Sequence, residues 1–82
     1  MIYELDLHRL TVDEALYKCD QFLHDAYRIG YFQVSIIHGK GTGMLRDSIR
    51  SYLSQHPLVR SYRRGGKDEG GEGVTIVELR TK

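Results

Sequence analysis

Residues 34–45 pass from a strand pattern to a helix pattern through a loop that holds three glycines. The apolar run 34–37 precedes the loop 38–43, which reads H-G-K-G-T-G, and a helical pattern begins at Met44. Glycine lets the backbone adopt positive φ and lets a ligand approach closely. A helix that starts directly after such a turn offers unpaired N–H groups and a partial positive charge, which suit phosphate. The stretch predicts a strand–turn–helix unit, whose turn either binds phosphate or serves folding alone.

The spacing of these glycines excludes two common nucleotide-binding motifs. The loop lacks the G-x-x-x-x-G-K-[ST] spacing of a Walker A loop and the final x-x-G of the dinucleotide-binding fingerprint. If the loop binds phosphate, it does so in another way.

Regular patterns before this loop define a strand and a helix. Residues 3–8 alternate apolar and polar side chains, which indicates a half-buried strand. Thr11 and Glu14 have the spacing of a capping box, and apolar residues then recur every three or four positions until Gly30. This pattern is typical of an amphipathic helix of about five turns. Cys19 falls on its apolar side, so we expect this residue in the core.

The second half of the chain adds a strand at 31–37, a helix and two further strands. The helix after the glycine loop should end near His56, because Pro57 disfavours helical backbone in the residue before it. Residues 58–63 and 74–79 have strand patterns. Five of the nine residues 65–73 are glycine, which predicts a mobile loop of the kind that often carries function.

This order of elements, β-α-β-α-β-β, predicts an α/β fold. The first two strands should be parallel with a right-handed crossover, and the last two should form a hairpin. Two helices cannot cover both faces of a four-stranded sheet. We therefore expect a two-layer sandwich, in which both helices lie on one face of a mixed sheet and the other face is largely open.

Length and composition indicate a single soluble domain over residues 1–82. The chain has no apolar run of the roughly 18–20 residues that cross a membrane, and its N-terminus has no secretory signal pattern. Cys19 is the only cysteine, so no internal disulfide can form. A reducing, cytoplasmic location and a monomeric state are the simplest expectations.

The two halves of the chain differ in charge. Residues 1–33 contain three basic and six acidic residues, which gives −3, and residues 34–82 contain nine basic and five acidic residues, which gives +4. A basic second half is typical of a surface that binds polyanions, although ordinary solvated surface would give the same pattern. The cationic side chains concerned are Lys40, Arg46, Arg50, Arg60, Arg63, Arg64 and Lys67.

Four side chains could act together on a phosphodiester. Asp6 and His8 share one side of the first strand near its carboxyl end, roughly 7 Å apart by strand geometry. His38 and Lys40 follow the second strand. If the two parallel strands are neighbours, all four groups meet at one edge of the sheet. One group could then activate a nucleophile, another could protonate the leaving oxygen, and cations could hold the phosphate.

Structural roles would also account for these residues. A strand-end aspartate such as Asp6 commonly caps a turn, and His38 could be a packed histidine that is hydrogen-bonded to the backbone. Asp6 and His8 together offer two ligands, which is far from a closed metal site. His24 and His56 look isolated in the sequence, and we assign them no catalytic role.

Taken together, the motifs resemble those of the small MutS-related (Smr) domain family. Residues 5–8, L-D-L-H, resemble the family's L-D-L-H-G motif, and residues 36–46 resemble its glycine-rich H-G-x-G segment. Residues 56–59 and 70–79 also resemble family features. The match covers nearly the whole chain, and the order and spacing of the motifs make it specific.

The resemblance implies a fold similar to the C-terminal domain of bacterial translation initiation factor three. It also implies a nucleic-acid-binding domain that in many members nicks DNA or cleaves RNA. By the matching motifs, Asp6 and His8 would take part in catalysis, and His38 with the loop would bind the phosphate backbone. Because the grouping of side chains at the sheet edge adds His38 to this pair, the candidate catalytic residues are Asp6, His8 and His38. The candidate nucleic-acid-binding residues are Arg9, Gly39, Lys40, Gly41, Thr42, Gly43, Arg46, Arg63, Arg64 and Lys67.

One position departs from the family pattern, because Arg9 stands where the first motif has a glycine. If that glycine has positive φ or allows close approach of the substrate, Arg9 would strain the backbone or block the site. If it does neither, Arg9 could add a contact to phosphate.

The first hypothesis is an endonuclease that nicks or cleaves structured DNA or RNA, with a role in DNA repair or recombination. The second is a non-catalytic module that binds nucleic acid or a ribosomal surface through the same basic edge. The third is a protein-interaction domain that uses the open face of the sheet. The sequence leaves open whether the substrate is DNA or RNA and whether Mg²⁺ or Mn²⁺ takes part.

Overall fold

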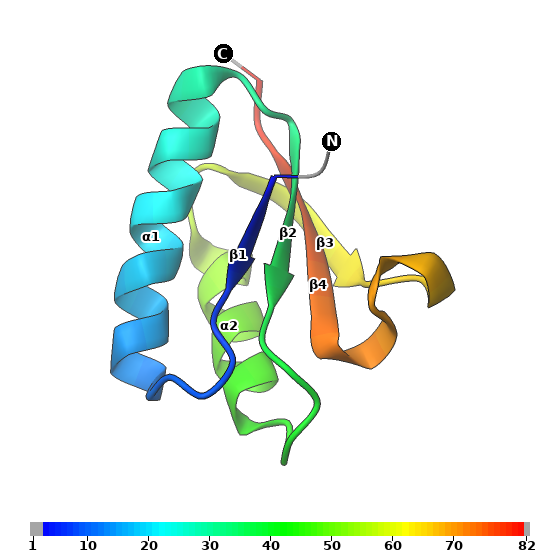
Figure 1. The fold of residues 1–82 in the computed structure, drawn as a ribbon. Helices are drawn as coiled ribbons and strands as arrows, with labels where there is room; N and C mark the ends of the chain where they lie inside the picture. The colour runs from blue at the N-terminus through cyan, green and yellow to red at the C-terminus, as the bar shows by residue number, and fades with distance from the viewer. Residues whose placement is uncertain (1–2, 82) are drawn as a thin grey trace.

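A computed structural model describes residues 3–81 of the chain. They form one four-stranded sheet with both helices packed on the same face (Figure 1). The elements are β1 (Glu4–Asp6), α1 (Val12–Ile29), β2 (Gln33–Ile37), α2 (Met44–Gln55), β3 (Val59–Arg64) and β4 (Val74–Leu79), and two 3₁₀ turns, Lys67–Glu69 and Gly71–Gly73, lie between β3 and β4. The predicted two-layer α/β sandwich is confirmed.

The strand order across the sheet is β1-β2-β4-β3. β1 and β2 run parallel, as their connection through α1 predicts, and β3 and β4 form the predicted antiparallel hairpin. β4 also pairs antiparallel with β2, a contact that no local pattern indicates. The start of β4 therefore lies beside the carboxyl end of β2, where the glycine loop begins.

Local signals explain where the helices begin and end. Thr11 caps α1, because its hydroxyl accepts the amide of Glu14 while the Glu14 carboxylate accepts the amide of Thr11. Gly30 ends α1 with left-handed backbone at a φ of 106°. α2 ends at Gln55, two residues before Pro57. The largest difference from the predicted bounds is β1, which pairs over Glu4–Asp6 rather than over residues 3–8.

The core lies between the two helices and the inner face of the sheet. Leu23, Ile36, Leu53 and Val77 are among its buried side chains. Cys19 is buried with them, as predicted, and this burial raises the pKa of its thiol to about 12. Neither helix is long and apolar enough to cross a membrane within the described part of the chain.

The loop 65–73, expected to be mobile because of its glycines, contains two turns that hydrogen bonds hold in place. The Glu69 carboxylate accepts two bonds from the Arg63 guanidinium, at 2.7 and 2.9 Å, and one from the Gly66 amide at 2.8 Å. These bonds lower the pKa of Glu69 to about 2, and those from Arg63 have the largest effect. The loop lies along the outer face of the sheet, where Glu69 and Ile76 line a common groove, so this face is less open than expected.

Candidate functional site

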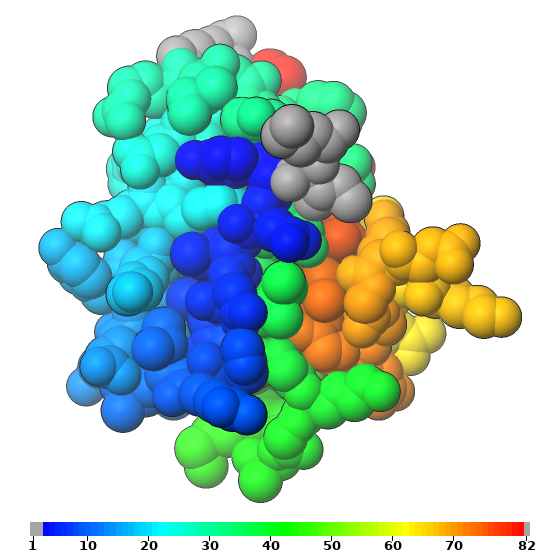
Figure 2. All heavy atoms as spheres, in the orientation of Figure 1, coloured from blue at the N-terminus to red at the C-terminus, as the bar shows by residue number. Residues whose placement is uncertain are grey.

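The carboxyl ends of β1 and β2 and the first turns of both helices meet at one end of the molecule (Figure 1). At this end the segment after β1, drawn in blue, lies beside the glycine loop, drawn in green (Figure 2). A cleft of about 310 Å³ separates residues 9–12 from residues 38–46. The ends of the two parallel strands therefore meet, as predicted, and the cleft is lined by His38 and Lys40 but not by Asp6 or His8.

The backbone of the glycine loop is left-handed at the positions where glycine is favoured. φ is 80° at Gly39 and 86° at Gly43. A Cβ atom on Gly39 would lie 3.4 Å from Cβ of His8, so the loop lies directly against the end of β1. The carbonyl of Gly73 accepts the amides of both His38 and Gly39 at 3.0 Å. The loop is thus held between β1 and the residue that precedes β4.

His38 is buried, with only 4% of its surface exposed. Its Nδ1 lies 2.9 Å from the carbonyl oxygen of Gly39, which can only accept, so Nδ1 carries a proton. Its Nε2 lies 2.8 Å from the hydroxyl of Thr75, which donates to it in the neutral ring. Burial lowers the pKa of His38, which favours this neutral form. Both ring nitrogens of His38 are thus hydrogen-bonded within the fold, and these bonds hold the ring between Gly39 and Thr75.

Arg50 extends this hydrogen-bonded chain into α2. Its Nε donates to the hydroxyl of Thr75 at 3.1 Å, so Thr75 accepts from Arg50 and donates to His38. The Nη2 atom of Arg50 is buried and has no hydrogen-bond partner within residues 3–81. Sequence reasoning grouped Arg50 with the surface cations and missed this link, because Thr75 lies 25 positions away on a different element.

Asp6 and His8 form a hydrogen-bonded pair on the outer side of β1. Oδ1 of Asp6 accepts the ring Nδ1 of His8 and also the backbone N–H of His8, the latter at 3.1 Å. The bond from the ring is the main reason why the pKa of Asp6 lies below its usual value. Both side chains are about half exposed. Because a carboxylate only accepts, Nδ1 of His8 carries a proton, and Nε2 remains available to a ligand.

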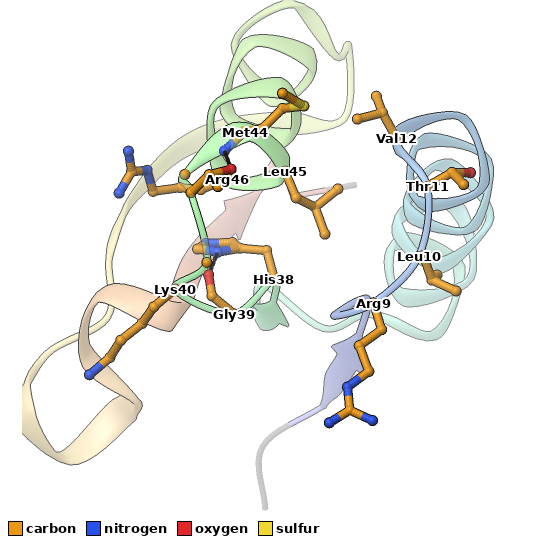
Figure 3. Close-up of a pocket in the computed structure, with 13 residues that line it drawn as sticks. Arg9, Leu10, Thr11, Val12, His38, Gly39, Lys40, Met44, Leu45 and Arg46 are labelled. Carbon is orange, nitrogen blue, oxygen red and sulfur yellow. Dashed lines mark hydrogen bonds between the residues drawn. The ribbon is translucent and has the colours of Figure 1, made fainter.

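Three cations border the cleft. Lys40 and Arg46 lie on the wall formed by the loop and α2, and Arg9 lies on the opposite wall (Figure 3). Arg9 has a φ of 72° and is the only non-glycine residue with positive φ in the described range. The position therefore favours glycine, as the family pattern suggests, while the Arg9 side chain adds a charge to the cleft.

The remaining predicted binding residues fall into two groups. Lys40, Arg64 and Lys67 line a second groove that adjoins the cleft along the loop 65–73. Arg64 lies 3.7 Å from Glu72, a long and exposed ion pair. Arg63 is not part of this surface, because its guanidinium is held by the two bonds to Glu69.

A polar cluster far from the cleft corrects the expectation that His24 and His56 are isolated. Oδ1 of Asp20 lies 2.8 Å from Nε2 of His56 and 3.3 Å from Nε2 of His24. These are the only three possible metal ligands that lie together in the part of the chain that the structure describes. Nδ1 of His56 accepts the amide of Leu58 at 3.2 Å, so the proton of the neutral ring is on Nε2, where a metal would have to bind. We interpret the cluster as a polar link between α1 and the end of α2.

Comparison with known proteins identifies the family. The Smr domain family matches residues 5–80. The protein named endonuclease MutS2 of Caldicellulosiruptor saccharolyticus is 55% identical over 76 residues, which cover 93% of this chain and 10% of that protein. A second endonuclease MutS2, from Clostridium beijerinckii, is 53% identical with the same coverage. The chain thus spans about a tenth of the length of the curated relatives that it matches.

Solved structures agree with this match. The crystal structure of the Smr domain of Thermus thermophilus MutS2 has a TM-score of 0.94 at 46% identity, covering 96% of this chain and 99% of that one. The structure of YdaL, a stand-alone small MutS-related protein from Escherichia coli, has a TM-score of 0.87 at 30% identity, covering 95% of this chain and 64% of that one. The chain belongs to the Smr domain family.

Proposed function

We propose that this domain binds nucleic acid at the cleft and cleaves a phosphodiester bond with the Asp6–His8 pair. One observation carries the proposal: His8, held by Asp6, lies against the glycine loop, with its Cβ 3.4 Å from the Cβ position of Gly39. An oriented histidine and a turn suited to phosphate therefore lie side by side. The name endonuclease, which the MutS2 relatives carry, supports this assignment.

The loop and the start of α2 provide the phosphate site. Gly43 offers no side-chain cap, and the amides of Leu45 and Arg46 lie in the first turn, where they have no acceptor within the helix. Their partial positive charge, with Lys40 and Arg46 beside them, attracts the phosphate. The same groups stabilise the negative charge that grows on the phosphate oxygens as the nucleophile attacks.

Asp6 and His8 provide the proton transfer. Asp6 keeps the proton on Nδ1 of His8, so Nε2 is the atom that exchanges a proton with the ligand. Nε2 takes a proton from the attacking water as the new P–O bond forms and the bond to the leaving oxygen breaks. The Asp6 carboxylate stabilises the resulting imidazolium, which gives up its proton as the leaving oxygen is protonated. The two side chains are bonded to each other and offer two ligands, which are too few for a closed metal site.

A binding module without cleavage is the second candidate, and Arg9 favours it. Arg9 occupies a strained backbone position next to His8 and adds a cation to the cleft. Its charge would strengthen phosphate binding, whereas the strained backbone lies next to the proposed catalytic histidine. This combination suits a domain that binds its ligand without cleaving it.

A nicking assay separates the two candidates. Supercoiled plasmid and an end-labelled structured RNA are incubated with the wild type, Asp6→Ala and His8→Gln, each with Mg²⁺, with Mn²⁺ and with EDTA. We expect the wild type to cleave and both variants to be slower by about 100-fold or more, since a positioned acid–base group contributes roughly 10²–10⁴-fold. Asp13→Ala, which removes an exposed acid outside the cleft, is the matched control and should cleave like the wild type.

Two outcomes contradict parts of this proposal. Full cleavage by Asp6→Ala and His8→Gln would rule out the Asp6–His8 mechanism. Salt-sensitive binding by the wild type without cleavage under any condition would leave the binding module as the function.

A further inference from the structure

One part of the cleft lining is apolar, and phosphate binding does not account for it. Val12, Met44 and Leu45 line the cleft from the first turns of the two helices, and Leu10 lines it from the segment just before α1. Leu45 points into the space between the two walls, and Met44 and Val12 lie on opposite walls of it (Figure 3). Contact with a phosphate does not stabilise apolar side chains, so we expect a second, apolar part of the ligand to contact this surface.

Exposure alone would not distinguish Met44. It is 67% exposed, but Ile29 and Phe32 are each 62% exposed elsewhere on the molecule, and scattered exposed apolar residues are normal. What sets Met44 apart is its place in a cleft that Arg9, Lys40 and Arg46 also line. Leu10 and Leu45 are packed against the core, so part of the apolar surface is held in place, whereas Met44 is exposed.

The size of the cleft limits what it can hold. Its volume of about 310 Å³ is at the lower end of the roughly 300–1,000 Å³ typical of small-molecule sites. A base inside a duplex is stacked on both faces and cannot enter such a cleft unless it is unpaired and turned out of the stack. The cleft thus fits one flat apolar group attached to one phosphate.

We propose that the cleft receives a single unpaired nucleobase, which contacts Val12, Met44 and Leu45 while the phosphate of the same nucleotide binds the glycine loop. The inference rests on the proposed nucleic-acid binding and adds the class of substrate to it. Every base has a face that can lie on apolar side chains, so the site tolerates any sequence. The domain selects DNA or RNA in which a nucleotide is bulged, displaced or single-stranded.

A competition assay with two matched duplexes tests the pocket. One duplex carries a single bulged adenosine, and the other carries an abasic residue at the same position, so the two present the same number of phosphates. Fluorescence anisotropy should show that the wild type binds the adenosine duplex about five- to tenfold more tightly. This is the lower end of the gain from stacking one base on an aromatic side chain, because the cleft offers aliphatic side chains instead.

The double variant Val12→Ala, Met44→Ala should lose this preference, to about twofold or less, and should bind the abasic duplex as the wild type does. Ile29→Ala removes an equally exposed apolar side chain outside the cleft and should keep the full preference. Alanine is a good helix former at both cleft positions, so the double variant is expected to fold.

Each other result overturns the pocket. Equal, strongly salt-dependent binding of both duplexes by the wild type would overturn it and leave the proposed nucleic-acid binding intact. A preference that survives in the double variant would place the base elsewhere. Absence of salt-dependent binding to either duplex would overturn the pocket and the proposed function together.

Discussion

At the scale of single residues, surroundings rather than residue type separate the two histidines of the site. His8 is half exposed and keeps Nε2 available, because only its Nδ1 is bonded to Asp6. His38 is buried and uses both ring nitrogens. The sequence makes both histidines candidates for catalysis, and their different surroundings are the reason why the proposed mechanism uses His8.

Arg9 gives a prediction at this scale. Arg9→Gly should raise the free energy of unfolding by about 0.5–1 kcal/mol. Left-handed backbone costs an L-residue about 1–2 kcal/mol, and glycine avoids this cost. About half of the gain is offset because glycine loses more conformational entropy when the chain folds. The φ of 72° at Arg9 places it in this region. Urea denaturation measures the change.

Arg9→Ala is the matched control, because it removes the same charge but keeps a Cβ atom and therefore the strain. It should not stabilise the domain. Equal stabilisation by both substitutions would show that charge, rather than backbone conformation, determines the effect at this position.

At the scale of elements, one threonine joins three parts of the site. Thr75 on β4 connects His38 at the end of β2 to Arg50 on α2. The glycine loop lies between these two elements, so its position depends on how β4 is inserted in the sheet. Residues far from the glycine loop in the sequence thus contact the element on which the loop begins.

Thr75→Val should lower the free energy of unfolding by about 1–3 kcal/mol, the usual cost of leaving a buried polar group unsatisfied. Thr75 is fully buried, and valine keeps its shape while removing the hydroxyl that His38 and Arg50 use. Chemical denaturation checks this value. Thr81→Val, at an exposed position after β4, should change stability by less than about 0.5 kcal/mol. If Thr75→Val changed the free energy of unfolding as little as Thr81→Val, the hydrogen bonds of Thr75 with His38 and Arg50 would not stabilise the fold.

At the scale of the whole molecule, the distribution of charge matters more than its sum. The net charge is only +1. Yet the cleft and the adjoining groove share Lys40, and Arg9, Arg46, Arg64 and Lys67 line one or the other of them. A surface of this kind suits a nucleic-acid backbone, and binding to it should weaken as salt rises.

Lys40→Ala should reduce the slope of log K against log salt concentration by about one, because one phosphate contact is lost. Binding of a fluorescent duplex between low and moderate salt measures this slope. Arg60→Ala is the control: Arg60 is exposed near the start of β3, at the opposite end of that strand from Arg64, and its loss should leave the slope unchanged. Equal effects of the two substitutions would argue against a localised interface.

What the sequence by itself determined is the set of elements and one half of the site. The capping box at Thr11, the left-handed Gly30 and the apolar periodicities are local signals, and each acts within a few residues. The sequence also predicts that Asp6 and His8 lie near the glycine loop, on the condition that the two parallel strands of the β-α-β unit are neighbours, and β1 and β2 do pair in the sheet.

Only the tertiary structure decided the strand order β1-β2-β4-β3 and the roles that depend on it. In the folded chain His38 is buried against Thr75, and Arg63 forms an ion pair with Glu69. His56 is hydrogen-bonded to Asp20 and so connects the two helices. The His38 and His56 partners lie 37 and 36 positions away in the sequence, so no local pattern records those contacts. Periodicity shows which side of an element is buried, whereas packing between elements determines which polar groups meet there.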